Sequence, residues 1–341
     1  MSSVAGRTIR LLITAAIVVF LVIFARTIDW QQAWNAIRGA SLPLLALAFA
    51  ANFASLLFKG VRWWMFLRAA GARSLFLATR ATIAGAGLNN VLVANGGEAA
   101  RVVFITRATG LSSATVLATL ALERLFDPVG FVILLVYGAM AFDLPPAIDR
   151  WRMPAQIALG VIAVLVIWFL YSARNAQPDD LVEENVAHEG LWSRIKGYLA
   201  GFALSARALS SAPRFLAALT LSMLSWIGQI MTFKYAAAAA HVDMSMGASL
   251  ATLLAINLGL LIRATPGNVG FFQVVFAITA EQFGIAREDA IAVSLLIQTL
   301  QIIPITLLGA ALAPEFIFRK PAASAGVTEE SEELARLARK T

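Results

Sequence analysis

Six long apolar stretches, each bordered by polar or charged residues, dominate the hydrophobic pattern of this chain. They cover residues 9–26, 42–59, 114–142, 155–171, 215–238 and 290–313. Stretches close to the roughly 20 residues that cross a bilayer predict transmembrane helices. The first also looks like a signal-peptide core, but no clear small-residue cleavage site follows it, which favours a retained span.

Two further regions, residues 82–106 and 247–283, are apolar but interrupted by Gly, Asn, Pro and charged residues. Lys59, Arg62, Arg68, Arg73 and Arg80 lie together with no acid between them, which indicates a cytoplasmic loop, whereas residues 239–246 contain no Lys or Arg. The first interrupted region would then enter and return on the cytoplasmic side, and the second on the outside. Two hairpins opening to opposite faces are the layout of an inverted repeat in a transporter.

Composition agrees with a membrane protein, because 60% of the residues are hydrophobic and 14% are charged. We therefore predict an all-α polytopic membrane protein with about six full spans, two interrupted hairpins and both termini in the cytoplasm. Residues 1–320 would form one membrane domain and residues 321–341 a charged cytoplasmic tail. The expected location is the bacterial cytoplasmic (inner) membrane. The sequence specifies no oligomeric state.

The net charge of +7 is interpreted as topological, with Lys and Arg holding loops in the cytoplasm. No basic folded surface with groove-reading elements is visible, so we expect no nucleic-acid partner. The chain has no cysteine, and its two histidines lack metal-ligand spacing. With no nucleophile–base constellation either, the sequence predicts no metal, no cofactor and no enzymatic activity.

The segment LERLFDP, residues 122–128, places Glu123, Arg124 and Asp127 inside a predicted span. Ionisable groups in hydrocarbon cost several kcal/mol each on insertion scales, so they persist mainly when they pair or face a polar cavity. Helical spacing would put Glu123 and Asp127 on one face, with Arg124 beside Asp127. The segment is therefore a candidate part of a polar pathway across the bilayer.

Polar residues also mark both interrupted regions. Asn89 and Asn95 precede Glu98 and Arg101, which begin a new helical piece where a helix dipole suits an anion, although the two could also simply pair. The second region contains Arg263, Pro266, Asn268 and Gln273, and the last span contains Gln298 and Gln301. Backbone breaks at membrane depth are tolerated where they line a cavity. For Ser222, Ser225, Gln229, Gln298 and Gln301, helix packing is the favoured role. Gln298 is nevertheless kept as a candidate substrate-binding residue, together with Asn89, Asn95, Glu98, Arg101, Glu123, Arg124, Asp127, Arg263, Pro266, Asn268 and Gln273.

Taken together, these segments resemble the signature regions of the lysylphosphatidylglycerol synthase/flippase transmembrane family. The matching pieces are Asn95-Gly96-Gly97-Glu98 with Arg101, Gly110-Leu111-Ser112, Leu122-Glu123-Arg124 with Asp127, and Thr265-Pro266-Gly267-Asn268-Val269-Gly270 with Phe272. The resemblance covers about residues 42–313. It implies a helical fold with re-entrant segments and, as in the best understood members, movement of an aminoacylated phospholipid between leaflets.

The chain departs from that family in three respects. No aminoacyl-transfer domain follows the membrane region, Gln298 stands where the family often has Arg, and the turn at Pro266 differs from a Ser-Pro-Gly-Gly type. Lipid synthesis is therefore not implied, and the substrate is left open.

The sequence favours a flippase-type translocator whose partner is a membrane lipid with a charged headgroup. Arg101, Arg124 and Arg263 would hold a phosphate, because guanidinium binds phosphate bidentately. Glu98, Glu123 and Asp127 would balance these cations. The alternatives are an ion-coupled transporter of a soluble anion and a non-transporting partner of an envelope-lipid or glycosyl-transfer enzyme.

Overall fold

The computed structural model describes residues 30–91, 96–142, 211–259, 268 and 270–318, with scattered positions between 145 and 164. Its elements are α2 (Trp30–Arg38), α3 (Leu42–Ala69), α4 (Leu75–Val91), α5 (Gly96–Thr109), α6 (Ser113–Ala141), α11 (Ala212–Ala239), α12 (Met246–Gly259), α13 (Phe271–Glu281) and α14 (Arg287–Phe318). The predicted span 9–26, most of 155–171 and the tail 321–341 lie outside the described residues.

Three described helices, α3, α11 and α14, are both long and apolar enough to cross a membrane. They coincide with the predicted spans 42–59, 215–238 and 290–313. Helix α6 confirms the helix predicted at 114–142; its 29 residues extend about 43 Å. Ser112 begins it as an N-cap whose side chain accepts a hydrogen bond from the backbone N–H of Thr115. The short helix α2, which packs on α14, was not predicted.

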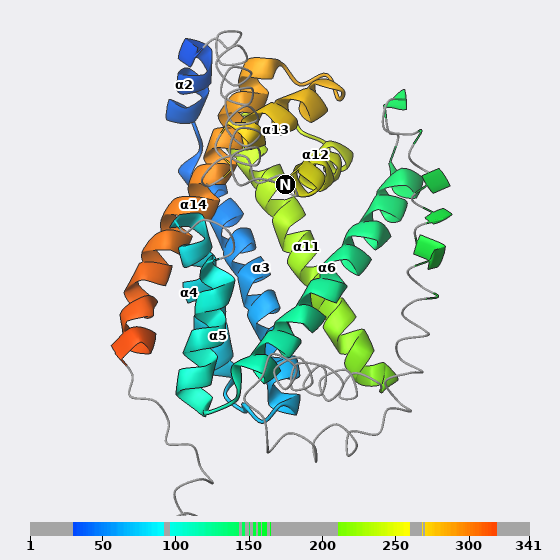
Figure 1. Ribbon diagram of the computed structural model, residues 1–341. Helices are drawn as coiled ribbons and strands as arrows, with labels where there is room; N and C mark the ends of the chain where they lie inside the picture. Colours follow the sequence, from blue (N-terminus) through cyan, green and yellow to red (C-terminus); the bar gives the residue numbers. More distant parts are fainter. Residues whose placement is uncertain are drawn as a thin grey trace, which may run out of the picture.

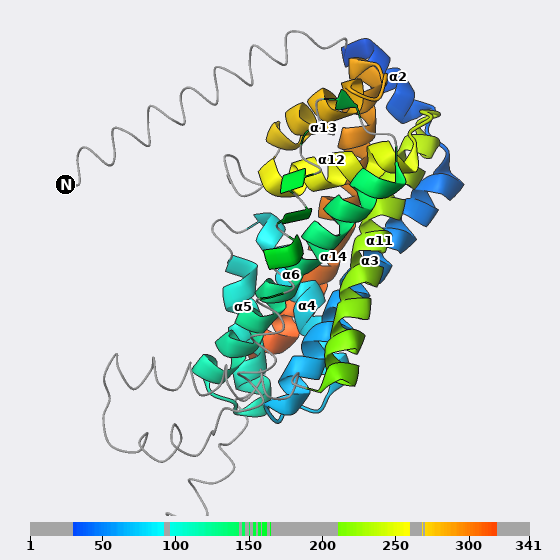
Figure 2. The same ribbon diagram turned by 90° about the vertical axis from the view of Figure 1, so that its right-hand side faces the viewer.

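Both interrupted regions are pairs of short helices, as the Gly, Asn and Pro residues indicated. Helices α4 and α5 form a hairpin whose open ends lie at the lower end of the bundle in Figure 1. Helices α12 and α13 form a second hairpin between the upper ends of α11 and α14 (Figures 1 and 2). At the first hairpin, the carboxamide oxygen of Asn89 accepts the Gly97 N–H at 2.9 Å, which ties the end of α4 to the start of α5.

The chain therefore passes twice through the order long helix, hairpin, long helix. Helix α3 descends in Figure 1, the first hairpin follows, and α6 rises; α11 rises, the second hairpin follows, and α14 descends. Helices α3 and α11 pack against each other antiparallel. This opposed arrangement is the one expected of an inverted repeat.

Buried apolar side chains gather in two large clusters, one around each hairpin, and in a small third one at Val132 and Val136 of α6. The first hairpin packs with Trp63, Phe66, Leu122 and Phe126. The second hairpin packs with α11 and α14 through residues such as Phe233 and Ile297. The apolar cores thus lie toward the two ends of the bundle.

The predicted cytoplasmic loop at residues 59–80 is wrong for its first part. Helix α3 continues ten residues beyond Lys59 to Ala69, and Arg62 is only 1% exposed. Arg80 also belongs to a helix, α4. The physical reason is that Arg62 is followed by the apolar run Trp-Trp-Met-Phe-Leu. With the apolar residues before Lys59, this run keeps the helix packed in the bundle before and after the charge.

Helices α4 and α14 cross in close contact through two glycines. A Cβ atom on Gly87 would lie 2.6 Å from the Ile305 carbonyl oxygen and 2.8 Å from the Gly309 Cα atom. Both are backbone atoms, so the two helices would have to separate to admit a side chain. Small residues that let backbones approach are a common way to hold membrane helices together.

We expect Gly87→Ala to lower the free energy of unfolding by about 1–3 kcal/mol, the usual cost of overpacking. The measurement is the thermal unfolding midpoint of the purified protein in detergent. Gly160→Ala is the matched control, because this helical glycine has no atom within 4 Å of an added Cβ. Equal midpoints for the two variants would contradict the close crossing.

Candidate functional site

Two carboxylates of α6 form the centre of a buried ion-pair cluster. Glu123 accepts a 2.6 Å hydrogen bond from Arg101 of α5, and Asp127 accepts one of 2.8 Å from Arg62 of α3. The Arg62 guanidinium also lies 3.7 Å from Glu123. Arg62 and Glu123 are almost fully buried, so water has little access to these ion pairs. The pairs join α3, α5 and α6.

A third pair joins Arg124 to Glu98 at the start of α5. Arg124 is about half exposed, unlike the buried arginines of the cluster. The local pairings considered from the sequence, Arg124 with Asp127 and Glu98 with Arg101, are therefore replaced by contacts between helices. Each of the three carboxylates, Glu98, Glu123 and Asp127, forms an ion pair with a guanidinium. The described residues contain no group of three side chains that could hold a metal ion.

Neighbouring side chains fix the orientation of the two buried arginines. The Arg101 guanidinium lies over the Trp63 ring, 3.9 Å from its centroid, and the Trp63 indole donates to Thr119. Arg62 donates to the Ser222 hydroxyl of α11 at 2.5 Å. In the part of the chain that is described, the Nε atoms of Arg62 and Arg101 have no hydrogen-bond partner. The ion pairs are thus built into the packing between helices.

The cluster carries one positive charge more than its carboxylates balance. Lys59 lies on α3 three residues before Arg62. No described carboxylate comes within 4.0 Å of its ammonium group, and no described residue forms a hydrogen bond with it. Lys59 instead lines a cavity next to the cluster.

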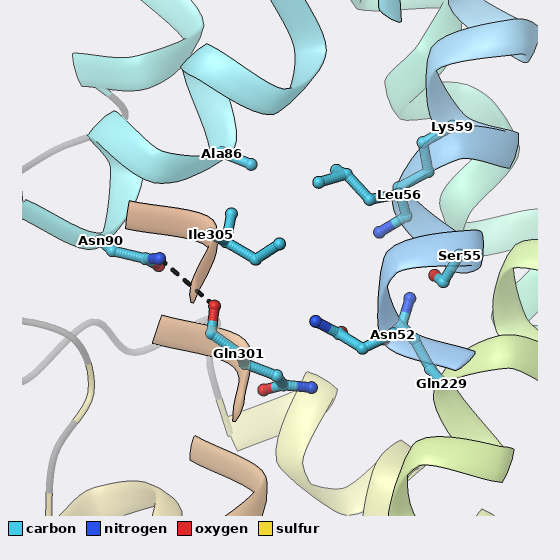
Figure 3. A pocket seen from close by; sticks show the side chains of 9 residues that line it. All are labelled: Asn52, Ser55, Leu56, Lys59, Ala86, Asn90, Gln229, Gln301 and Ile305. Carbon is cyan, nitrogen blue, oxygen red and sulfur yellow. Dashed lines mark hydrogen bonds between the residues drawn. The ribbon is translucent and has the colours of Figure 1, made fainter. Parts of the chain in front are cut away.

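This cavity has a volume of about 270 Å³ and lies near the middle of α3 and α14; Figure 3 shows its lining side chains. Helices α3, α4, α11 and α14 supply its lining residues. Its lining residues are Asn52, Ser55, Leu56, Lys59, Ala86, Asn90, Gln229, Gln301 and Ile305. Polar groups at this depth are the usual mark of a substrate or ion pathway in a membrane protein.

The end of the first hairpin forms one wall of the cavity. Asn90, in the last turn of α4, donates to the Thr306 hydroxyl of α14 at 3.1 Å and lies 3.5 Å from the Gln301 carbonyl oxygen (Figure 3). On the opposite wall, the hydroxyls of Ser55 and Ser225 lie 3.0 Å apart and join α3 to α11. Hydrogen bonds beside the cavity therefore join α4 to α14 and α3 to α11.

The remaining predicted residues gather near the second hairpin. Gln273 of α13 donates to Gln298 of α14 at 2.5 Å and accepts the Gly270 N–H at 2.7 Å. Asn268 adopts a left-handed backbone with φ 55°. Gln298 lies three residues before Gln301, so both hairpins contact α14 next to the cavity. Asn95, Arg263 and Pro266 lie outside the described residues.

Sequence reasoning missed Lys59 and Asn52 as site residues and placed Arg62 in a loop. Gln229 and Gln301 were assigned to packing, whereas both line the cavity. Ser222 and Ser225 do join helices, as their predicted role requires. The apolar run that follows Arg62 could have indicated that the helix continues past this residue, because a solvated loop is rarely so apolar.

Comparison with known proteins covers nearly the whole bundle. Residues 8–309 match the family model for the lysylphosphatidylglycerol synthase TM region. A UPF0104 membrane protein of Methanothermobacter thermautotrophicus is 23% identical over 300 residues, covering 83% of this chain and 88% of that relative. The family match includes both hairpins and every wall of the cavity. The chain therefore belongs to the lysylphosphatidylglycerol synthase transmembrane family.

Proposed function

We propose that this protein translocates a lipid with a phosphate-bearing headgroup between the two leaflets of its membrane. The observation that carries this proposal is the unpaired ammonium of Lys59 in a polar cavity midway through the bundle. An ammonium with no ion-pair partner within 4.0 Å is costly at this depth, and an anion that entered the cavity would stabilise it. The phosphate of a lipid headgroup is such an anion.

The placement of the cavity supports movement across the membrane rather than binding at one face. Hairpins that open to opposite ends lie on either side of it, and both contact α14 beside it. Transporters built from inverted repeats hold their substrates near the midplane, between the repeats. The family description refers to an enzyme that makes a lipid, and this favours a lipid as the cargo over a soluble anion.

In this proposal, Lys59 takes the role that the sequence assigned to Arg101. Arg101 is enclosed by Glu123 and Trp63, which leaves it poorly placed to meet a headgroup. The paired arginines would fix the electrostatic field, and Lys59 would contact the phosphate. Arg124, half exposed beside Glu98, would meet the headgroup on its way to or from the cavity.

The distribution of charge supports one orientation in the membrane. Arg68, Arg73, Arg80 and Arg107 lie toward the lower end in Figure 1, where Arg73 and Arg80 line a second cavity of about 470 Å³. Acidic residues Asp243, Glu281 and Glu288 lie toward the upper end. By the positive-inside rule, the lower end would face the cytoplasm of a bacterial inner membrane, with both termini on that side.

The test uses vesicles of phosphatidylcholine containing the purified chain and a trace of acyl-labelled fluorescent phosphatidylglycerol. Dithionite added outside bleaches labelled lipid as it reaches the outer leaflet. We expect bleaching of the inner pool to be several-fold faster than in protein-free vesicles. Ala86→Phe, which would place a ring in the cavity, should abolish this gain, whereas Ala50→Phe on the exposed face of α3 should not.

The alternatives give different results in the same vesicles. Bleaching at the protein-free rate would reject lipid translocation. Uptake of a soluble anion in those vesicles would then identify an ion-coupled transporter. If neither lipid nor anion moved and an envelope-lipid enzyme co-purified with the chain, the protein would be a non-transporting partner.

A further inference from the structure

The chemistry of the cavity wall narrows the class of headgroup. Four carboxamides (Asn52, Asn90, Gln229 and Gln301), one hydroxyl (Ser55) and one ammonium (Lys59) supply its polar surface. None of the described lining residues is acidic. We propose that the cavity takes a headgroup in which one phosphate joins a neutral, hydroxyl-rich group, that is, a polyol or sugar phosphate. The proposal rests on the translocation function and names its substrate class.

Unsatisfied carboxamides point to a hydroxylated ligand. Within the part of the chain that the structure describes, the side chains of Asn52, Gln229 and Gln301 form no hydrogen bond with protein. Figure 3 shows these three side chains converging on the space between the helices. A carboxamide both donates and accepts, and so does a hydroxyl, so each carboxamide can donate to one hydroxyl of a polyol and accept from another.

The same wall disfavours a headgroup that carries its own ammonium. A zwitterionic or aminoacylated headgroup would bring a second cation beside Lys59, and no described carboxylate faces the cavity to receive it. The nearby carboxylates, Glu123 and Asp127, are already engaged by Arg101 and Arg62. Like charges without a counterion repel more strongly near a protein interior than in bulk water. The cavity therefore selects its headgroup in two ways: its carboxamides bind hydroxyls, and its described lining offers no carboxylate to an ammonium.

The volume of the cavity suits a single lipid headgroup. A volume of about 270 Å³ is just below the roughly 300–1,000 Å³ of pockets that hold drug-sized molecules. The acyl chains would stay in the surrounding lipid, alongside exposed apolar side chains such as Leu307.

The decisive comparison is between phosphatidylinositol and phosphatidylethanolamine, both labelled on the acyl chain, in the dithionite assay. The wild-type chain is expected to move phosphatidylinositol at least about tenfold faster. Gln301→Leu and Gln229→Leu should each slow phosphatidylinositol about two- to tenfold, the effect of losing one neutral hydrogen bond. Two separate variants guard against one that fails to fold.

A binding measurement separates failure of this inference from failure of the translocation proposal. The full chain in detergent is tested for a thermal shift with inositol 1-phosphate and with phosphoethanolamine. A shift with inositol 1-phosphate but no movement of any labelled lipid would reject translocation and identify a soluble polyol phosphate as the ligand. Movement of both lipids at equal rates, with equal shifts for both soluble compounds, would overturn the polyol-phosphate inference and leave translocation standing.

Discussion

Replacing Arg62 by methionine should lower the free energy of unfolding by about 3 kcal/mol, the lower part of the range for breaking a buried ion pair. Arg62 is 1% exposed and forms the 2.8 Å contact with Asp127 as well as the hydrogen bond to Ser222. Methionine fills much of the same volume but leaves the Asp127 carboxylate without its partner. The lower value is expected because Asp127 is one-third exposed and Glu123 keeps Arg101.

Thermal unfolding of the purified protein in detergent measures this loss, with Arg68→Met as the control. Arg68 lies on the same helix but is exposed, and its contact with the Trp64 ring contributes little. Arg62→Met combined with Asp127→Asn should recover much of the stability, because neutral replacements of both partners leave neither charge of this pair buried alone. Equal unfolding midpoints for Arg62→Met and Arg68→Met would show that the cluster is not a structural element.

The second large effect is expected at Lys59, and it should fall on transport rather than on stability. Lys59→Met should slow lipid translocation by about 10- to 150-fold, the loss that corresponds to one hydrogen bond with a charged group. Its stability should change little, since no described carboxylate loses an ion-pair partner within 4.0 Å. Lys59→Arg keeps the charge and should retain a large part of the rate.

Translocation rates and unfolding midpoints measured on the same preparations separate the two residues. Arg62 and Lys59 are three residues apart on one helix, yet the first is paired and the second faces the cavity. If the Lys59→Met protein moved lipid at the wild-type rate, the Lys59 ammonium would have no part in translocation. A protein that fails to fold would show instead that Lys59 has a structural partner.

The helices and the two hairpins could be predicted from the sequence, because they depend on local properties. Apolar length marks α3, α11 and α14, and Gly and Asn residues at the end of α4 mark the first break. The charges of Glu123 and Asp127 in an apolar helix correctly indicated that these groups are paired, whereas the polar pathway stays a prediction. Such signals lie within a few turns of a helix, where spacing alone decides which residues share a face.

The partners of those charges could not be predicted, because they come from distant parts of the chain. Asp127 pairs with Arg62, 65 residues away, and Asn90 contacts Thr306, 216 residues away. The positive-inside rule counts basic residues in the sequence and takes no account of burial, so Arg62 was assigned to a loop. Single polar residues such as Asn52 and Gln229 are also common in helix packing, and only the arrangement of four helices shows that they share a cavity.

Native mass spectrometry of the chain released from lipid nanodiscs tests the central claim most directly, namely that Lys59 holds the phosphate of a lipid in the cavity. We predict that the wild-type chain and Arg68→Met retain one anionic, hydroxyl-rich lipid, and that Lys59→Met loses it. The same lipids on all three proteins, in the same proportions, would contradict the account.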